Sequence, residues 1–393
     1  MRRVKLAWWA TVLLFLAHGL VVSTWVSRIP AVQSSLHINN GVLGLTLLSS
    51  AIGAVTTIPV TGWFITRYGS RKVAVTTSIA FCCGLSLLGV AFNAVTLSIA
   101  LFFFGAVAAG MDVSMNAHGV EVEKELGAPT MSRFHGMFSL GGMIGAGIGG
   151  CVAAHGITHL PHFAASAAVN LALVLLAWPA MLDTHDAAVP SGHRLPLNRI
   201  PRVLLALSAI AFCILLSEGA MADWTAVYMR QVQHAGPGIA AQGYALFSAA
   251  MAFFRFVGDM ITARLGPLLT VRGGSLVAAV GLLWALSVHS PSWALPGFAA
   301  AGAGFSVIIP LVFGSGGRVP SINPGAGIAT VTGIGYVGFI VGPPTIGFTS
   351  QLLTLRYALG VVVACCLISA VLAQSMRLLQ PDPGAEHAAE IHF

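Results

Sequence analysis

The feature of this sequence that most limits its fold is a series of long apolar runs along nearly its whole length. An α-helix needs about 20 apolar residues to cross the hydrocarbon core of a bilayer. Cutting the 393-residue chain at its polar and turn-forming clusters leaves twelve such runs. They are continuous rather than alternating, which excludes a membrane β-barrel. The twelve expected membrane helices cover approximately residues 6–27, 41–65, 73–92, 95–117, 132–154, 162–182, 203–230, 239–263, 273–290, 294–313, 326–350 and 357–376.

The composition also favours a lipid solvent. Hydrophobic residues make up 56% of the chain and charged residues 8%, whereas a soluble domain carries about 25% charged residues. The first apolar run follows Arg2, Arg3 and Lys5 and could pass for a signal peptide, but its length and the runs after it indicate a membrane helix. The basic residues are scattered through short loops rather than gathered on one face, so the expected partner is the lipid bilayer and not nucleic acid.

The distribution of Lys and Arg predicts the orientation of the helices. Cytoplasmic loops of membrane proteins carry an excess of these residues. If the first helix starts in the cytoplasm, 15 of the 19 basic residues lie on the cytoplasmic side. Arg28, Arg230 and Arg356 lie outside, and Arg255 lies within a membrane helix. Both termini are therefore expected in the cytoplasm, and the protein in a bacterial-type inner membrane.

The chain divides into two halves of six expected helices. A polar, proline-containing loop at 183–202 separates residues 1–182 from residues 203–393, which end in a short polar tail. The two halves share a sequence repeat. Thr66-Arg67-Tyr68-Gly69 after the second run corresponds to Ala263-Arg264-Leu265-Gly266 after the eighth. The fifth and eleventh runs likewise share a spacing of small residues: Gly145, Gly149 and Gly150 against Gly338, Gly342 and Pro343. Internal repeats of this kind place a solute site between the halves, near the bilayer midplane.

The loop after the second run resembles a transporter signature. Residues 62–72 read Gly-x-x-x-Thr-Arg-Tyr-Gly-Ser-Arg-Lys. They are similar to the loop Gly-x-x-x-Asp-x-x-Gly-Arg-Lys/Arg of the major facilitator superfamily, with Thr66 in place of the usual Asp. The resemblance implies the major facilitator fold and a gating role for Arg67, Gly69 and Arg71. The stretches 110–116, 132–136 and 218–224 resemble the rhizopine-associated (MosC-like) subgroup near the fucose-permease branch, which implies a sugar-like or polyol-like solute.

Two carboxylates of the seventh run are candidates for chemistry within the membrane. Glu218 lies about 15 residues into the run, near the midplane, with no basic residue three or four positions away. A carboxylate kept from water readily holds a proton, so Glu218 is a candidate for proton coupling or substrate binding, with a structural hydrogen bond as the alternative. Asp223 lies about 140° farther around the helix. With its neighbour Trp224 it is a candidate for substrate contact, and pairing with Arg28 at an outer gate is the alternative.

Two further helices carry candidate cavity residues. Asp112 and Asn116 are four apart on the fourth run and share a face, which suggests proton coupling by Asp112 and substrate binding by Asn116, or else an interhelical bond. On the first run Thr11, His18 and Trp25 recur every seven residues. His18 and Trp25 would offer a hydrogen bond and a stacking face to a sugar ring, and simple packing is the alternative.

Other charged residues suggest conformational roles. Glu121 and Arg133 flank the loop between the fourth and fifth runs and resemble the ion pair that braces the inner gate of sugar porters, which His135 could join. Arg255 and Asp259, four apart on the eighth run, are expected to neutralise each other.

Metal and enzyme chemistry find no support in the sequence. The spacing of His155, His159 and His162 could suit a metal, but Gly156 and Pro161 break any helix that would align them. The six cysteines lack metal-ligand spacing. Neither a Walker loop, a nucleophile elbow nor a dinucleotide fingerprint is present, so neither a cofactor nor an enzymatic activity is expected.

The sequence thus favours a monomeric, proton-coupled symporter of a small polar solute, working by rocking of residues 1–182 against residues 203–393. Glycines at 136–150 resemble the spacing of the antiporter motif of drug exporters, so proton-driven efflux of amphiphilic compounds stays open. A membrane sensor or structural subunit that moves nothing is the other alternative. The carboxylates within the membrane disfavour it, because such a protein could replace them with apolar residues.

Overall fold

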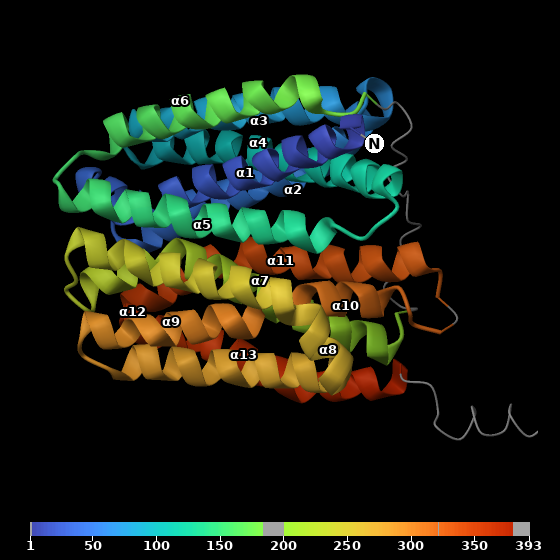
Figure 1. Ribbon diagram of the computed structural model, residues 1–393. Helices are drawn as coiled ribbons and strands as arrows, with labels where there is room; N and C mark the ends of the chain where they lie inside the picture. The colour runs from blue at the N-terminus through green and yellow to red at the C-terminus, as the bar shows by residue number, and fades with distance from the viewer. Residues whose placement is uncertain (1, 184–199, 321, 380–393) are drawn as a thin grey trace, which may run out of the picture.

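The computed structural model describes residues 2–183, 200–320 and 322–379 as a bundle of long helices (Figure 1). Within these residues all regular secondary structure is helical, as the sequence predicts. The α-helices are α1 (Arg2–Ser35), α2 (Asn40–Tyr68), α3 (Ser70–Gly89), α4 (Ala94–Leu126), α5 (Met131–Ala154), α6 (His159–Ala177), α7 (Arg202–Gln231), α8 (Pro237–Ser287), α9 (Pro291–Phe305), α10 (Ile308–Gly316), α11 (Pro324–Leu352), α12 (Leu355–Ala358) and α13 (Gly360–Leu372). Short 3₁₀ helices η1 (Trp178–Ala180) and η3 (Ala373–Leu379) follow α6 and α13.

Eleven helical segments of the described residues are long and apolar enough to cross a membrane. Two of them join shorter helices, since Pro291–Gly316 spans α9 and α10 and Leu355–Leu378 spans α12, α13 and part of η3. Large apolar side chains such as Trp9, Phe92 and Val371 are exposed on the outside of the bundle. A lipid solvent suits such a surface, and the protein is a multi-pass membrane protein.

The expected eighth and ninth membrane helices form one element, α8, with a break at Gly266. Its φ of 76° and ψ of 161° are non-helical and belong to a region of backbone conformation that is essentially restricted to glycine. Gly69, between α2 and α3, has nearly the same conformation, with φ 84° and ψ 154°. These are the glycines that the sequence repeat pairs, so the repeat extends to the backbone.

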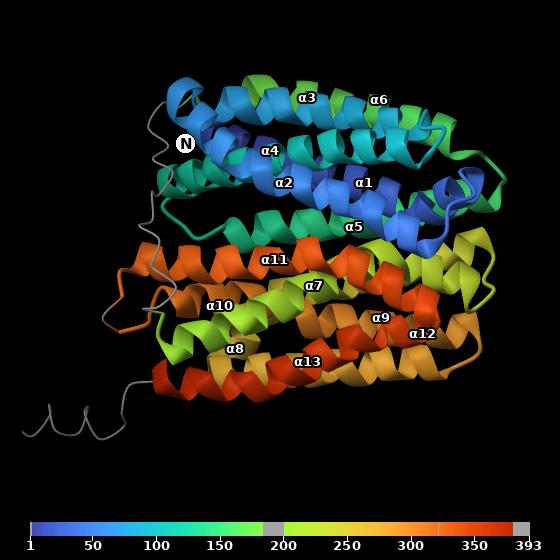
Figure 2. The ribbon, with the colours of Figure 1, turned by 180° about the vertical axis from the view of Figure 1, so that it is seen from behind.

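The helices gather in two groups, α1–α6 on one side and α7–α13 on the other, in both views (Figures 1 and 2). Across the seam, α5 packs on α8 and α2 packs on α11. Glycine permits this close approach, since a Cβ on Gly44 would lie 2.7 Å from the carbonyl oxygen of Pro343. Most of the expected linker at 183–202, with Arg194 and Arg199, and the tail at 380–393 lie outside the described residues.

The two ends of the bundle differ in their number of Lys and Arg residues, and the end with more of them is called the basic end. The basic end, on the right in Figure 1, carries the α2–α3 and α4–α5 junctions and the break in α8. The opposite end, on the left in Figure 1, carries the α1–α2, α5–α6 and α7–α8 junctions. Asparagines fix helix starts at this end: Asn39 accepts a hydrogen bond from the Val42 amide, and Asn93 forms a capping box with Thr96.

Candidate functional site

Two adjoining cavities lie between the two groups of helices. The central cavity, of about 420 Å³, is lined by residues of α1, α2, α4, α5, α7, α8 and α11. The basic-end cavity, of about 640 Å³, continues from it toward the start of α5 and the α8 segment before Gly266. Asp112, His135, Arg255 and Tyr336 belong to the lining of both. Volumes of this size suit small organic ligands.

Asp112 and Asn116 lie together on the cavity face of α4. The Asn116 Nδ2 donates to the Asp112 Oδ1 at 3.1 Å and to the Asp112 carbonyl oxygen at 2.8 Å. Their expected shared face is therefore confirmed. Asp112 reaches both cavities and Asn116 only the basic-end cavity.

Asp223 on α7 lines the central cavity. Its alternative pairing with Arg28 is wrong, because Arg28 lies elsewhere and donates from Nη2 to the Ile157 carbonyl oxygen at 2.6 Å. Trp224, the next residue, is fully buried and lies outside the lining of either cavity. A rotation of about 100° per helical residue separates the two side chains.

Glu218 lies one residue before the cavity-lining Gly219 but is itself outside both linings. Its Oε1 is buried and has no hydrogen-bond partner among the described residues. The carboxylate interacts electrostatically with Arg255 and Tyr336. Glu218 therefore lies behind the shared wall of the cavities, within the field of their charged groups.

For the cavity residue Arg255, the partner predicted from the sequence is wrong. It forms no ion pair with Asp259, and the ion pairs of the described residues lie elsewhere. Its Nη1 instead donates to the Ser139 Oγ of α5 at 2.9 Å, and its Nε donates to the Ser306 carbonyl oxygen at 3.3 Å. The guanidinium thus joins the two groups of helices in the cavity wall to which Asp112 also belongs, and it interacts electrostatically with Glu218. Helical spacing could not reveal partners on other elements.

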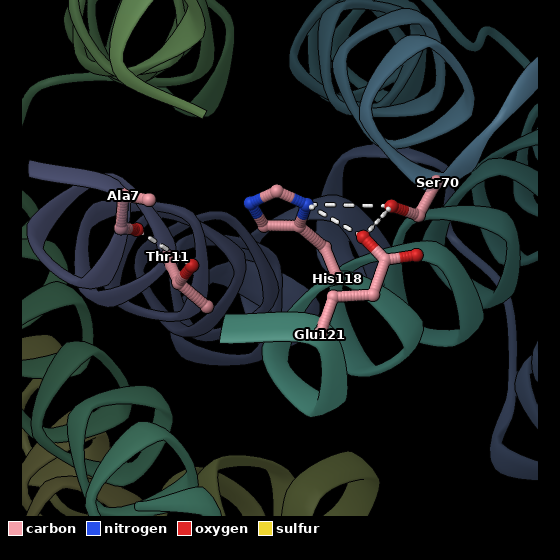
Figure 3. A network of polar contacts seen from close by, with 5 residues as sticks. All are labelled: Ala7, Thr11, Ser70, His118 and Glu121. Carbon is pink, nitrogen blue, oxygen red and sulfur yellow. Dashed lines mark hydrogen bonds and ion pairs between the residues drawn. The ribbon is translucent and has the colours of Figure 1, made fainter. Parts of the chain in front are cut away.

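The stripe on α1 reaches the central cavity with two of its three members. His18 and Trp25 are largely buried and line the cavity. The His18 ring packs against Phe81 at 5.1 Å and Phe138 at 5.3 Å between centroids, and its Nδ1 has no hydrogen-bond partner in the described protein. Thr11 is buried away from the cavity and donates to the Ala7 carbonyl oxygen at 2.9 Å (Figure 3). Aromatic residues of α11, Tyr336 and Phe339, complete the wall, and no sequence signal marked them.

The expected inner gate contains a histidine that the sequence interpretation missed. Ser70 Oγ donates to Glu121 Oε2 at 2.8 Å, and His118 Nδ1 lies 3.3 Å from Ser70 Oγ and 3.6 Å from Glu121 Oε2 (Figure 3). His118 is fully buried, just beyond the expected end of the fourth membrane helix. The sequence signal that could have found it is its position three residues before Glu121, because residues three apart on a helix are neighbours. The pairing of Glu121 with Arg133 stays a prediction.

The remaining gate candidates lie in different surroundings. Arg71 forms an ion pair with Asp183 at 3.7 Å, at the basic end. The Arg67 guanidinium lies over the Tyr68 ring, 5.7 Å from its centroid. His135 lines both cavities and packs edge-on against Phe15 at 5.2 Å.

The opposite end is joined by an amide network of Gln33, Asn40 and Gln231. Gln33 Nε2 donates to Asn40 Oδ1 at 2.8 Å, and Asn40 Nδ2 donates to Gln231 Oε1 at 3.1 Å. Gln231 Nε2 donates to Gln33 Oε1 at 3.1 Å and to Asn40 Oδ1 at 3.2 Å. Since Gln231 ends α7, this network links the two groups of helices where the cavities do not reach.

Comparison with known proteins agrees with this arrangement. A family model described as Major Facilitator Superfamily matches residues 7–321. An uncharacterized MFS-type transporter of Yersinia pestis is 34% identical over 372 residues, which cover 93% of this chain and 95% of the relative. The membrane protein MosC of Rhizobium meliloti is 30% identical over 392 residues, which cover 96% of this chain and 93% of MosC.

Solved structures show the same fold at low identity. A mutant of the nucleoside transporter NupG is similar with a TM-score of 0.75 at 14% identity, covering 96% of this chain and all 100% of that one. The transporter FucP in its outward conformation is similar with a TM-score of 0.62 at 17% identity, covering 95% and 99%. The resemblance to the superfamily and to MosC is confirmed, and the chain belongs to the Major Facilitator Superfamily.

Proposed function

We propose that this protein is a secondary active transporter that moves a small polar solute across a bacterial-type inner membrane by alternating access, coupled to protons. The solute would be a sugar, a polyol or a related metabolite. The observation that carries the proposal is the pair of cavities between the helix groups, with Asp112, Asp223 and Arg255 in their walls. Charged groups at this depth are costly in a membrane protein, which favours a role in moving a solute or an ion.

The proposed topology has twelve crossings with both termini in the cytoplasm. The break at Gly266 would make α8 two crossings, because it repeats the conformation of Gly69 between α2 and α3. The excess of Lys and Arg would place the basic end in the cytoplasm. The moving units would be residues 1–182 and 203–393, linked by residues 183–202.

The wall of the central cavity supports a sugar-like solute. Trp25, Phe138 and Phe339 offer apolar ring faces, while Asp112, Asp223 and His18 offer polar groups. A sugar or polyol needs both kinds of contact. Two proteins of the same fold also carry small metabolites, since NupG is a nucleoside transporter and FucP a fucose:proton symporter. They do not identify the solute of this chain.

The proton-coupling step would use Glu218 and Asp112. Both are carboxylates with electrostatic links to Tyr336, and Arg255 interacts with Glu218 while donating to Ser139 across the seam. Protonation of Glu218 would remove its attraction for Arg255. The guanidinium would then be free to change its contact with Ser139, which joins the two groups of helices, and in this way a proton could bias their rocking.

A binding screen followed by transport tests the proposal. Purified protein would be screened by thermal unfolding against sugars, polyols, nucleosides and amphiphiles, and any stabilising compound tested for uptake into proteoliposomes under a proton gradient. Glu218→Gln should abolish gradient-driven accumulation and leave counterflow of the same solute partly intact. Glu125→Gln, an exposed carboxylate at the basic end, is the matched control. Accumulation by Glu218→Gln equal to that of the parent would remove Glu218 from the coupling step.

Efflux of amphiphilic compounds is the second candidate function. The lining of the central cavity favours it in one respect, because most of its side chains are apolar. Stabilisation by amphiphiles alone, with proton-driven efflux in vesicles, would replace the sugar-like solute. Absence of any solute-dependent current or pH change in proteoliposomes would instead favour a membrane sensor.

A further inference from the structure

A third cavity lies at the opposite end, away from the proposed transport site. This rim cavity has a volume of about 420 Å³. Its walls come from α1, from the α5–α6 junction and from the α7–α8 junction, and include Arg28, His159 and Arg230. It therefore lies between the two groups of helices, beside the amide network.

Arg28 is buried here and has no negative partner in the part of the chain that the structure describes. Only 3% of its surface is exposed. Its Nη2 donates to the Ile157 carbonyl oxygen, whereas its Nε and Nη1 are buried and have no hydrogen-bond partner among the described residues. A buried guanidinium without a counter-charge is strongly unfavourable, because its lost hydration is not replaced. Because Arg28 lines the rim cavity, a counter-charge there could approach its guanidinium, although Nε and Nη1 themselves are covered by protein.

The rest of the rim adds positive potential. Arg230 lines the cavity and donates from Nη1 to the Ala235 carbonyl oxygen at 2.5 Å. The helices α6 and α8 begin here, and neither Thr158 nor Gly236 supplies a side-chain hydrogen bond to the first turn. Free amide groups and the positive end of the helix dipole favour an anion at such positions.

The surrounding sequence offers no carboxylate to balance these charges. Asp and Glu are absent from every segment that forms the opposite end: residues 28–40, 90–94, 154–162, 230–240, 288–291 and 352–356. The lining of the rim cavity likewise contains neither residue type among the described residues. The described residues therefore supply no counter-charge for Arg28.

We propose that the rim cavity binds an oxyanion, either a free carboxylate or phosphate or the phosphate of a lipid headgroup, with Arg28 as its main ligand. Arg230 and the N-terminal ends of α6 and α8 complete the site. Because α1 and α6 lie in one group of helices and α7 and α8 in the other, the bound anion holds the opposite end closed. The site acts independently of the transported solute.

Anion titration of the full-length protein tests this site. The protein in a neutral detergent is titrated with inorganic phosphate and with acetate at constant ionic strength, and binding is followed by calorimetry and by the unfolding temperature. The parent should bind one of the two saturably. Arg28→Gln should raise the dissociation constant by about 10- to 100-fold, the effect of losing a charge-assisted hydrogen bond. Arg356→Gln, at the same end but outside the rim cavity, should leave it unchanged.

A second experiment, in lipid nanodiscs, identifies the source of the anion. Nanodiscs of phosphatidylcholine with and without phosphatidylglycerol are compared for parent and Arg28→Gln. Stabilisation by phosphatidylglycerol alone assigns the site to a headgroup, and saturable phosphate or acetate binding assigns it to a free anion. If Arg28→Gln does not fold, Arg230→Gln must weaken binding in its place. Binding that neither variant weakens, or a parent that responds to no anion in either arm, overturns the proposal.

Discussion

At the basic end, the polar contacts of Ser70, His118 and Arg71 run to ionisable side chains of the first group of helices or just after it. At the opposite end, the side-chain hydrogen bonds that join the two groups are uncharged, because Gln33, Asn40 and Gln231 make them through carboxamides. Carboxamides do not change protonation between pH 5 and 9, whereas histidine and carboxylate side chains can. Under the proposed function a proton would act at the basic end and in the cavities, while packing, amide hydrogen bonds and the proposed anion at Arg28 would hold the opposite end closed.

The packing beneath the amide network gives the largest expected effect. In Gly44→Leu, a Cβ only 2.7 Å from the Pro343 carbonyl oxygen must push α2 away from α11. Overpacking of this kind costs about 1–3 kcal/mol or more, enough to shift a two-state equilibrium by roughly 5- to 150-fold. The opposite end should open, and a cysteine at Leu47 in the central cavity should react faster with an impermeant maleimide added from that side.

The control for this substitution lies on α11, the helix against which Gly44 packs. A Cβ on Gly333 of α11 would meet nothing within 4 Å, so Gly333→Leu should leave the labelling rate at the parental value. Equal rates in the two variants would show that packing at Gly44 does not hold the opposite end closed. Both variants would carry serine at Cys83 and Cys151, the exposed native cysteines.

Gln231→Leu should open the same end to a smaller extent. The substitution removes three hydrogen bonds to Gln33 and Asn40, and these bonds are exposed or only partly buried. The expected cost of about 1–2 kcal/mol corresponds to a roughly 5- to 30-fold increase in labelling of the cysteine at Leu47. The increase should be the same at pH 6 and pH 8, and a strong pH dependence would contradict an uncharged closure. The control is Gln351→Leu, because Gln351 lines a surface pocket together with Gln33, Asn40 and Gln231 but does not join their network.

Glu121→Gln should have the smallest effect and only at the basic end. The substitution removes the charge that faces His118 and Ser70, contacts that lie within one group of helices. Labelling of a cysteine at Thr262 in the basic-end cavity should change by about two- to fivefold, as for a partly exposed ion pair. The cysteine at Leu47 should not respond. An equal response at both positions would remove the assignment of this cluster to the basic end, and Glu125→Gln serves as its control.

The sequence predicted the parts of this molecule that depend on local pattern. Apolar runs revealed the membrane helices, and the repeat of Gly69 at Gly266 revealed two matching breaks. A spacing of four placed Asp112 and Asn116 on one face, which their hydrogen bond confirms. Each of these features depends on the residues of a single helix or turn, so a local sequence pattern is enough to predict it.

The parts that failed depend on contacts between distant segments. Arg255 was paired with Asp259 because both lie on one helix, yet its hydrogen bonds go to Ser139 and Ser306 on other elements. His118 was missed because the expected helix ended one residue before it. The amide network joins residues 191 and 198 positions apart, and no single-sequence pattern links such residues.

Rocking of the two groups of helices as rigid bodies is the central claim, and paired spin-label distances test it most directly. One pair, at His37 and His234, spans the opposite end, and a second, at Glu125 and Arg318, spans the basic end; all four side chains are exposed. Distances would be measured in the parent and in Gly44→Leu, reconstituted in lipid. We expect Gly44→Leu to lengthen the first distance and shorten the second. Lengthening of the first distance with no change in the second would show a local distortion and contradict alternating access.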